Sequence, residues 1–308
     1  MVAERELLDE LGRRMTRLGD IFDLSKLEDR GRTTAGVRRY YEHSRAGYRF
    51  VHSEQGAMHM ALNPDGVFDP SGYAGQAQLV HERLLPGTRD VLELACGNGY
   101  NLALLAARNP EVRFVGVDLV SAQIQRAQAA LAELPRADAR TGDFQSLAVG
   151  DGAQDCVFVV ESLCHATDLP QALHEVARVL RPGGRFIVVD GWRTVTFDRL
   201  APIVRDATVA VERAMAVSAG QTLPQWRRVA SECGLHVIED LDLTAQIEPN
   251  LKRLEALAER FVSRPRLARM SRAFAPDALL MNAVAAYLMP LVVQAGAHTY
   301  RLLVLERG

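Results

Sequence analysis

Two acidic residues and a glycine-bearing loop carry the clearest chemical signal in this sequence. An apolar run that contains Glu93 leads into the loop from Ala95 to Gly99, and the next apolar run ends in Asp118. Glycine permits positive φ angles and lets a ligand approach the backbone closely. A carboxylate at the end of the second strand can accept hydrogen bonds from both hydroxyls of a ribose. The pattern therefore predicts a site for a nucleoside cofactor.

The segments around this loop alternate between the patterns of strands and helices. Strands are predicted over 89–94, 112–117, 137–141, 155–160 and 185–190, and helices over 76–85, 100–109, 121–133 and 169–180. Strands separated by helices indicate a parallel sheet built from right-handed crossovers.

Helical patterns also flank this alternating region. Leucines at helical spacing predict one or two amphipathic helices within 4–30. Residues 192–290 are mostly helical in pattern, with a strand near 235–240, and 299–306 is a final strand. We therefore expect an α/β fold with a helical cap over the active site at 1–75, a cofactor-binding core at 76–191, and a substrate-side helical insertion with the last strands at 192–308.

Composition narrows the class of protein. The 308 residues carry a net charge of −2, with 48% hydrophobic and 24% charged residues, so nothing indicates a nucleic-acid partner. No run approaches about 18 apolar residues, which predicts no membrane span. The start of the chain has early acids and no apolar signal core, and the four cysteines have no metal-ligand spacing. We expect a cytoplasmic protein with reduced thiols and a small-molecule substrate; a homo-oligomer is left open.

The loop itself discriminates between nucleoside cofactors. A dinucleotide site would place its last glycine at Leu102, so close packing of a pyrophosphate is not specified. Further landmarks follow at 141–144 (Thr-Gly-Asp-Phe) and 181–184 (Arg-Pro-Gly-Gly). Together with the loop they resemble the class I S-adenosylmethionine-dependent methyltransferases over roughly 76–191, with a Rossmann-like sheet. Ala95 stands where that family usually has a glycine; its methyl group is tolerable if the turn tightens only at Gly97.

This resemblance implies S-adenosylmethionine as the cofactor and assigns its contacts. The methionine and ribose portions would be lined by Glu93, Ala95, Gly97 and Gly99, and the ribose hydroxyls would be held by Asp118. Leu119, Asp143 and Phe144 would surround the adenine, and Gln123 and Tyr41 are further implied contacts. The alternative is an α/β domain that carries these residues for packing alone.

A second resemblance concerns the substrate. The segment 159–168 contains Glu161 and His165 and is similar to the Glu-x-x-x-His stretch of sterol and prenyl-diphosphate C-methyltransferases. The resemblance extends loosely from about residue 36 to the C-terminus, and 53–60 resembles the cofactor-covering segment of that group. Methyl transfer to an alkene leaves a carbocation, which a nearby carboxylate can stabilise and deprotonate. Glu161 is the predicted catalytic residue; alternatively it contacts only the cofactor or the backbone.

Other residues bear on the same prediction. Aromatic faces stabilise cations, and forked guanidinium groups suit a diphosphate, which would hold Mg²⁺ through its phosphates. The candidate substrate contacts are Tyr40, Arg45, Tyr48, Arg49, Phe50 and Trp192. Core packing of the aromatic residues and solvation of the arginines are the alternatives.

The sequence thus favours a C-methyltransferase of terpene biosynthesis that acts on an isoprenoid alkene, with a prenyl diphosphate as the preferred substrate. Three alternatives remain open. The first is a sterol or lipid C-methyltransferase. The second is an O- or N-methyltransferase of a small natural product that uses His165 as a base. The third is a cofactor-binding subunit without catalysis, against which the cofactor-binding pattern argues.

Overall fold

The computed structural model describes residues 2–24, 31, 33–47, 53–217, 220–271 and 277–308 of the chain. In this part of the chain seven strands form one sheet, in the order β3-β2-β1-β4-β5-β7-β6. The strands are β1 (Asp90–Leu94), β2 (Arg113–Asp118), β3 (Ala137–Thr141), β4 (Gln154–Val160), β5 (Leu180–Arg193), β6 (Leu235–Asp242) and β7 (His298–Arg307). The first five are parallel, and β7 runs antiparallel to both β5 and β6. The order reverses beside β1, where open α/β sheets bind ligands beyond the carboxyl ends of the strands.

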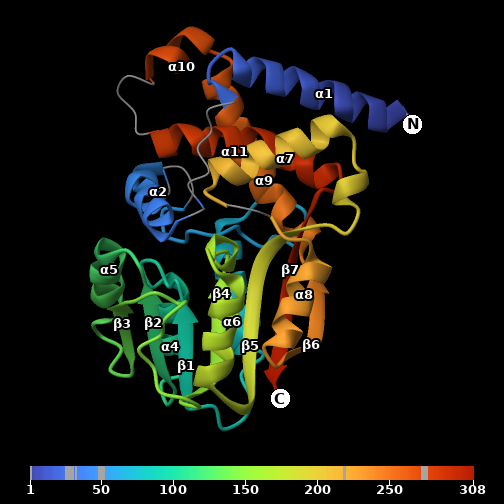
Figure 1. Cartoon of the computed structure of the whole chain (residues 1–308). Coiled ribbons are helices and arrows are strands. Elements are labelled where there is room, and N and C mark those ends of the chain that lie inside the picture. Colours follow the sequence, from blue (N-terminus) through green and yellow to red (C-terminus); the bar gives the residue numbers. More distant parts are fainter. Residues whose placement is uncertain (1, 25–30, 32, 48–52, 218–219, 272–276) are drawn as a thin grey trace.

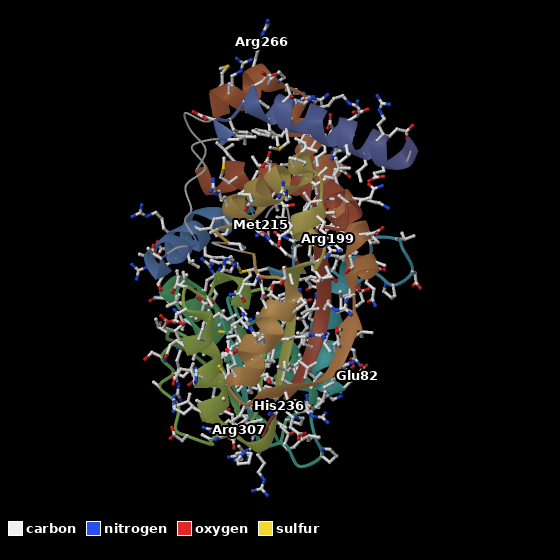
Figure 2. The ribbon with its side chains drawn as sticks, turned by 45° about the vertical axis from the view of Figure 1, so that its right-hand side comes forward. Glu82, Arg199, Met215, His236, Arg266 and Arg307 are labelled. Carbon is white, nitrogen blue, oxygen red and sulfur yellow. The ribbon has the colours of Figure 1, made fainter. Side chains whose placement is uncertain are left out.

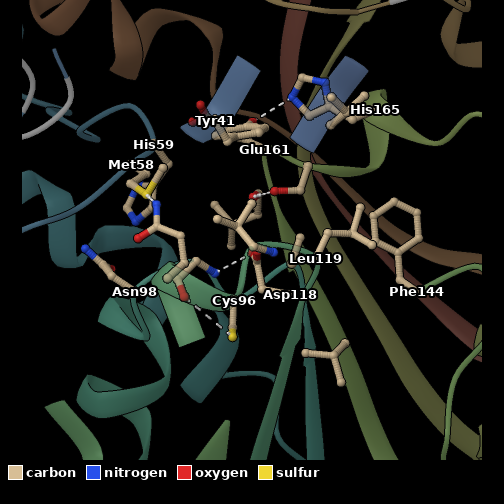
Figure 3. Close-up of a pocket in the computed structure, with 18 of the residues that line it drawn as sticks. Tyr41, Met58, His59, Cys96, Asn98, Asp118, Leu119, Phe144, Glu161 and His165 are labelled. Carbon is tan, nitrogen blue, oxygen red and sulfur yellow. Dashed lines mark hydrogen bonds between the residues drawn. The ribbon is translucent and has the colours of Figure 1, made fainter. Parts of the chain in front are cut away.

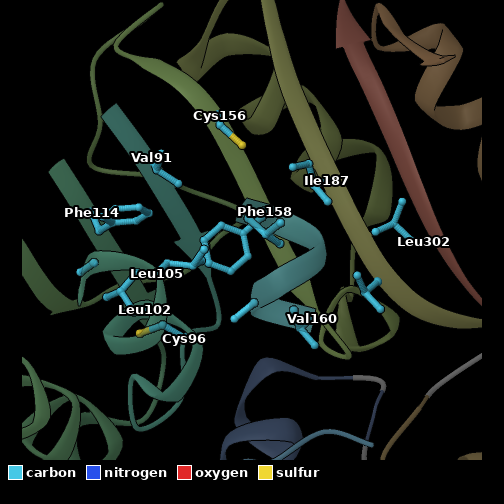
Figure 4. Packing of buried hydrophobic residues seen from close by; sticks show 14 of the residues in the cluster. Val91, Cys96, Leu102, Leu105, Phe114, Cys156, Phe158, Val160, Ile187 and Leu302 are labelled. Carbon is cyan, nitrogen blue, oxygen red and sulfur yellow. The ribbon is translucent and has the colours of Figure 1, made fainter. Parts of the chain in front are cut away.

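Helices cover both faces of this sheet because alternate side chains of each strand point to opposite sides. On one face, α3 (Gly75–His81), α4 (Tyr100–Arg108) and α5 (Ser121–Leu131) pack on strand residues such as Phe114 and Phe158 (Figure 4). On the other face, α6 (Leu169–Val179) and α8 (Leu223–Glu232) pack on neighbours such as Val157. The sheet is therefore buried on both sides, which leaves its carboxyl edge as the place for a site.

A layer of helices lies beyond that carboxyl edge (Figure 1). It contains α1 (Val2–Gly19), α2 (Thr34–Gly47), α7 (Pro202–Ala214), α9 (Thr244–Val262), α10 (Pro265–Ser271) and α11 (Asp277–Gln294). α1 packs against α7 and α11, and α2 packs against α11, so helices from both ends of the chain form one layer. Met215 lies between this layer and the sheet, whereas Arg266 marks its outer edge (Figure 2).

The observed elements differ from the predicted ones in two places that have a physical cause. The helix predicted over 76–85 ends at His81, and Pro86 disfavours a helical conformation at Leu85 just beyond it. β5 continues to Arg193 because it stays paired with β7 from Arg185 through Arg193. That extension carries Trp192 and Arg193 out to the helical layer. Among the described residues, no helix has the length and apolar character needed to cross a membrane.

Candidate active site

The loop between β1 and α4 turns through three residues with positive φ. Ala95 has φ 50°, Gly97 has φ 54° and Gly99 has φ 81°. The condition named for tolerating the methyl group of Ala95, a turn that tightens only at Gly97, is not met, because the left-handed conformation begins at Ala95. Such a conformation costs a residue with a Cβ roughly 1–2 kcal/mol. The hydrogen bond from Cys96 N to Val117 O, at 2.9 Å, ties the turn to β2.

Gly99 is required by packing as well as by its φ angle. A Cβ on this residue would lie 3.0 Å from the Cβ and 3.1 Å from the Cα of Ala127 in α5. The glycine thus lets the start of α4 pack closely on α5. It does not line the neighbouring cavity, so its role in this structure is the shape of the loop.

We expect Gly99→Ala to lower the free energy of unfolding by about 2–4 kcal/mol, because backbone strain and overpacking add. Gly87→Ala is the matched control: Gly87 has φ 86°, but a Cβ on this residue would meet nothing within 4 Å. The control should lose only the strain, about 1 kcal/mol. Urea unfolding of both variants measures the difference; equal losses would show that the contact with Ala127 is unimportant.

Asp118 links the loop to the end of β2. Its Oδ2 accepts a hydrogen bond from Gly97 N at 2.9 Å, and its Oδ1 accepts one from Val120 N at 2.8 Å. Burial raises the pKa of this carboxyl, against the effect of those two donors. Each carboxylate oxygen retains a further lone pair for a ribose hydroxyl. Asp118 is therefore positioned by the loop that it also stabilises.

A segment from the N-terminal part of the chain covers this loop (Figure 3). Asn98 Nδ2 donates to Gly56 O at 2.7 Å, and Gln123 Nε2 donates to Met58 Sδ at 3.2 Å. His59 Nε2 lies 3.2 Å from Asn101 Oδ1. Met58, His59, Asn98 and Asn101 were not singled out from the sequence. The resemblance of 53–60 to a cofactor-covering segment was the signal that could have found Met58 and His59.

A narrow cavity of about 80 Å³ lies between the loop and this covering segment. The predicted cofactor contacts that line it are Tyr41, Ala95, Gly97, Asp118, Leu119, Gln123 and Phe144. The other three predicted contacts, Gly99, Asp143 and Glu93, do not line it. The Asp143 carboxylate accepts a hydrogen bond from Gln145 N at 2.8 Å, within its own turn. Glu93 lies beneath the loop with 3% of its surface exposed.

The residues of this cavity fit S-adenosylmethionine. Oε2 of Glu93 has no hydrogen-bond partner among the described residues, and burial raises the pKa of this carboxyl to about 8. Asp118 offers ribose acceptors, and a Cβ on Gly97 would have Met58 Sδ as its nearest neighbour at 3.4 Å, which allows close approach to the backbone.

Glu161 follows the end of β4 in a strained backbone conformation. Its φ is 46°, and its N donates to Val189 O at 2.8 Å. Its Oε1 accepts hydrogen bonds from Met60 N at 2.7 Å and from Tyr300 OH at 2.6 Å. No described residue donates to its Oε2. Burial raises the pKa of this carboxyl to about 7, against the two donors, and the nearby Asp190 carboxylate raises it further. Strain of this kind is typical of functional positions.

A buried glutamine directs the tyrosine that contacts Glu161. Gln76 Nε2 donates to Tyr300 OH at 3.2 Å and to Met60 O at 2.6 Å. The Tyr300 hydroxyl therefore accepts from Gln76 and donates its own hydrogen to Glu161. Both donors to Glu161 are thus held by the same side chain, which leaves Oε2 as the oxygen able to take a proton.

His165 is held by hydrogen bonds at both ring nitrogens. Nδ1 lies 3.1 Å from Ala216 O, so it carries the hydrogen, and Nε2 accepts from Tyr41 OH at 2.7 Å. Burial lowers the pKa of His165 to about 4, so the ring is neutral near pH 7. This placement does not suit the predicted role of a general base, because Nε2 is already occupied by Tyr41. It suits a residue that orients Tyr41.

A second cavity of about 430 Å³ adjoins the first and extends between the sheet edge and the helical layer. Tyr41, Met58, Glu161 and His165 line both cavities. The wall of the larger one is mostly apolar, with Leu163, Met215, Trp226, Ile247, Leu251 and Met289 among its residues. Glu161 therefore lies at the junction of the narrow loop cavity and a larger, mostly apolar one.

The predicted substrate contacts are only partly covered by the described residues. Tyr40 and Trp192 line the large cavity. Tyr40 OH donates to Asn282 Oδ1 at 2.6 Å, and the Trp192 ring packs edge-on against Trp226 with centroids 5.5 Å apart. Tyr48, Arg49, Phe50 and the side chain of Arg45 lie outside the described residues. Within the described part of the chain, no group of three or more His, Cys, Asp or Glu could hold a metal ion, so Mg²⁺ would depend on phosphate ligands.

Comparison with known proteins agrees with this architecture. A family model described as a methyltransferase domain matches residues 92–188. The 24-methylenesterol C-methyltransferase 2 of Oryza sativa subsp. japonica is 30% identical over 54% of this chain and 48% of its own length. The S-adenosyl-L-methionine-dependent Diels-Alderase iccD of Talaromyces variabilis is 28% identical over 69% of this chain and 77% of its own. The chain thus spans about half the length of the sterol enzyme.

Solved structures share the fold across most of the chain. The 4+2 cyclase SpnF superposes with a TM-score of 0.71 at 21% identity, covering 89% of this chain and 96% of its own. A geranyl diphosphate C-methyltransferase from Streptomyces coelicolor, in complex with Mg²⁺, geranyl diphosphate and S-adenosyl-L-homocysteine, superposes with a TM-score of 0.64 at 18% identity, covering 88% and 96%. At these identities the likeness shows the fold.

Proposed function

We propose that this chain, whose residues 92–188 match a methyltransferase domain, uses S-adenosylmethionine to methylate an alkene carbon of an isoprenoid substrate. The observation that carries this proposal is the position of Glu161. Its carboxylate lies where the cofactor cavity meets the large apolar cavity, and its Oε2 accepts no hydrogen bond from the described residues. That is where a base for a substrate carbon is needed.

The reaction divides the work between the cofactor and the chain. Bound S-adenosylmethionine supplies an electrophilic methyl group. The π electrons of the alkene would form the new carbon–carbon bond while the methyl–sulfur bond breaks and its electrons stay on sulfur, which leaves a cation on the adjacent substrate carbon and S-adenosylhomocysteine as the leaving group. The Glu161 carboxylate stabilises that cation. Its Oε2 then accepts a proton from a substrate carbon next to the cation, and the electrons of the broken C–H bond form the new alkene. The aromatic faces of Tyr41 and Trp192 are further sources of cation stabilisation.

The proposal predicts a pH dependence with a defined sign. Since the carboxylate is the active form and the pKa of Glu161 is about 7, kcat/KM should rise with pH through about 7 and level off above it. Below that pH it should fall about tenfold per unit. Burial is the main cause of this raised pKa; Tyr300 OH and Met60 N lower the pKa, and the Asp190 carboxylate raises it. In the complex with S-adenosylmethionine and substrate, the sulfonium charge favours the ionised form of Glu161. The pH at which kcat falls should therefore be lower than the pH at which kcat/KM falls.

Tyr300→Phe provides the contrast for that measurement. It removes a donor to the charged form of Glu161, so the limb in kcat/KM should move to higher pH. Tyr287→Phe is the matched control, because Tyr287 OH accepts from Arg17 within the helical layer. The role of Glu161 would be contradicted if kcat/KM of the unaltered protein did not fall at low pH. It would also be contradicted if Tyr300→Phe did not move the pH at which kcat/KM falls.

The sequence favoured a prenyl diphosphate, and we retain it as a candidate. It is supported by the fold shared with the geranyl diphosphate C-methyltransferase. The large cavity adds a different consideration, because the arginine among its described lining residues, Arg193, is paired with Glu212. The first assay should therefore compare geranyl and farnesyl diphosphates, with and without Mg²⁺, against the corresponding alcohols, by mass spectrometry. Turnover of small phenols or amines above all of these would overturn the proposal.

A second candidate is a cyclase that uses the same fold. The similarity to the Diels-Alderase iccD covers 69% of this chain, and SpnF shares the fold. An apolar cavity of about 430 Å³ could fold a polyene for ring closure. The two candidates differ in cofactor consumption: C-methylation releases one S-adenosylhomocysteine per product, and a cycloaddition releases none. Quantifying S-adenosylhomocysteine against product separates them.

A further inference from the structure

Three side chains from different elements form a polar cluster in the wall of the large apolar cavity. Arg193 ends β5, Glu212 lies in α7 and His298 begins β7. Arg193 Nε donates to Glu212 Oε1 at 2.7 Å, and its Nη2 donates to Glu212 Oε2. His298 Nε2 lies 3.1 Å from Glu212 Oε1. Glu212 has only 5% of its surface exposed, so a charged group is buried beside an otherwise apolar chamber.

The cluster is a rigidly built feature of the cavity wall. A Cβ on Gly220 would collide with Glu212 Oε1 and would lie 2.6 Å from Arg193 Nε, so this glycine backbone packs directly on the ion pair. The Arg193 guanidinium also stacks over the Phe197 ring at 4.1 Å. Packing on both sides fixes the orientation of Arg193 and therefore of the groups it presents to the cavity.

The hydrogen bonds within the cluster define what it still offers. Because the Glu212 carboxylate only accepts, His298 Nε2 carries the hydrogen and Nδ1 is left as an acceptor. Nη1 of Arg193 donates to no described residue. Because Arg193 and His298 both line the cavity, the cluster can offer it a donor and an acceptor. The Glu212 carboxylate compensates the charge of the Arg193 guanidinium.

The cluster lies well away from Glu161, which follows β4 and is bonded to the neighbouring strand β5. Glu161 N bonds to Val189 O, and Arg193 follows four residues later in β5. At about 3.3 Å per residue, the backbones of Val189 and Arg193 are on the order of 13 Å apart. Both ends belong to one cavity, and the Trp192 side chain lines it between them.

We infer that this cluster binds a neutral oxygen function, a hydroxyl or a carbonyl, at the far end of the isoprenoid whose alkene lies beside Glu161. The placement of the alkene rests on the proposed function, whereas the cluster itself is a binding site that can be tested without turnover. A hydroxyl can accept from Arg193 Nη1 and donate to His298 Nδ1. A diphosphate is a poorer match, because the Glu212 carboxylate cancels the attraction of Arg193 and repels phosphate oxygens.

Binding measurements with three probes of one carbon skeleton test this inference. Farnesol, farnesyl diphosphate and farnesene are titrated calorimetrically into protein saturated with S-adenosylhomocysteine. We expect farnesol to bind about tenfold more tightly than each of the others, since it makes hydrogen bonds that farnesene lacks and avoids the carboxylate. Tighter binding of farnesyl diphosphate, or equal binding of farnesol and farnesene, overturns the inference.

Two variants ask whether the cluster is responsible. His298→Phe removes the acceptor but keeps the Arg193–Glu212 pair, and it should reduce the farnesol advantage over farnesene to about threefold or less. Glu212→Gln leaves the charge of Arg193 uncompensated, and it should raise the affinity for farnesyl diphosphate relative to farnesol about tenfold. Glu255→Gln, which breaks an ion pair with Arg14 elsewhere in the helical layer, is the matched control and should change neither ratio.

The outcomes separate this inference from the proposed function. If farnesol binds as expected and both ratios shift, but no methyl transfer is detected with any substrate, the site stands and the proposed function fails. If methyl transfer occurs and both variants leave the ratios unchanged, the inference fails and the proposed function stands. Because His298→Phe retains the buried ion pair, it decides the matter even where Glu212→Gln does not fold.

Discussion

Glu161→Gln is expected to lower the rate of product formation about 10²–10⁴-fold, the range typical for loss of a general base. Glutamine has nearly the same volume, and its carbonyl oxygen can still accept from Met60 N and Tyr300 OH. Glutamine carries no charge to stabilise a carbocation, and its amide nitrogen, which stands in place of Oε2, cannot accept the proton. Single-turnover kinetics with product detection by mass spectrometry measure the loss.

Cofactor binding is the companion readout for this variant. The affinity for S-adenosylhomocysteine, which lacks the sulfonium charge, should stay unchanged, because the loop and Asp118 are untouched. Glu239→Gln on the edge strand β6, where the side chain is 40% exposed and paired with Arg83, is the matched control and should retain full activity. Product formation by Glu161→Gln within a few-fold of the unaltered protein would mean that another group removes the proton.

Asp118→Asn is expected to weaken S-adenosylmethionine binding about 100-fold. The carboxylate accepts from Gly97 N and Val120 N, and an amide nitrogen in place of one oxygen would face a backbone N–H as donor against donor. Loss of one such charged acceptor, together with weaker acceptance from the ribose, amounts to about 3 kcal/mol, which corresponds to that change in affinity. Calorimetric titration measures it directly.

The control for Asp118→Asn is a carboxylate on the neighbouring strand. Asp138 in β3 pairs with Arg140, and its side chain is 46% exposed, so Asp138→Asn should leave cofactor affinity unaltered. Urea unfolding should show both variants folded under the assay conditions. An affinity unchanged in Asp118→Asn would show that this carboxylate does not contact the cofactor.

The fold and the cofactor side of the site could be predicted from the sequence because their signals are local. Strand periodicity and turn residues within 89–191 indicate the parallel sheet, and the Rossmann-like class I fold is confirmed by the observed strand order and by solved structures. The methyltransferase prediction is confirmed at the level of the domain. The acid and the glycines lie within one βαβ unit, so their proximity follows from the topology alone.

The local conformation of the loop could not be predicted from the same residues. Alanine occurs rarely with positive φ, so its residue type offered no reason to expect the turn to begin at Ala95. Glu93 was expected to line the cofactor site, and it lies beneath the loop instead. Its position depends on how deeply the loop sits over β1, which is a matter of tertiary packing.

The substrate side depends on contacts between distant segments. Glu161 receives its hydrogen bonds from Met60 and Tyr300, and the polar cluster joins Arg193 to Glu212 and His298. Such pairings have no signature in sequence spacing. The same holds for His165, whose partner Tyr41 comes from α2 and occupies the nitrogen that a base would need. The contact between His165 and Tyr41 therefore could not be predicted from the sequence.

The most direct measurement of the central claim is the fate of a labelled methyl group. The protein is incubated with S-adenosylmethionine carrying a CD₃ group and with the isoprenoid substrate that it turns over, and the product and S-adenosylhomocysteine are quantified together. C-methylation with Glu161 as base predicts a product with an intact CD₃ group on carbon, one substrate hydrogen lost, and one S-adenosylhomocysteine per product. A label on oxygen, or product formed without S-adenosylhomocysteine, would contradict it.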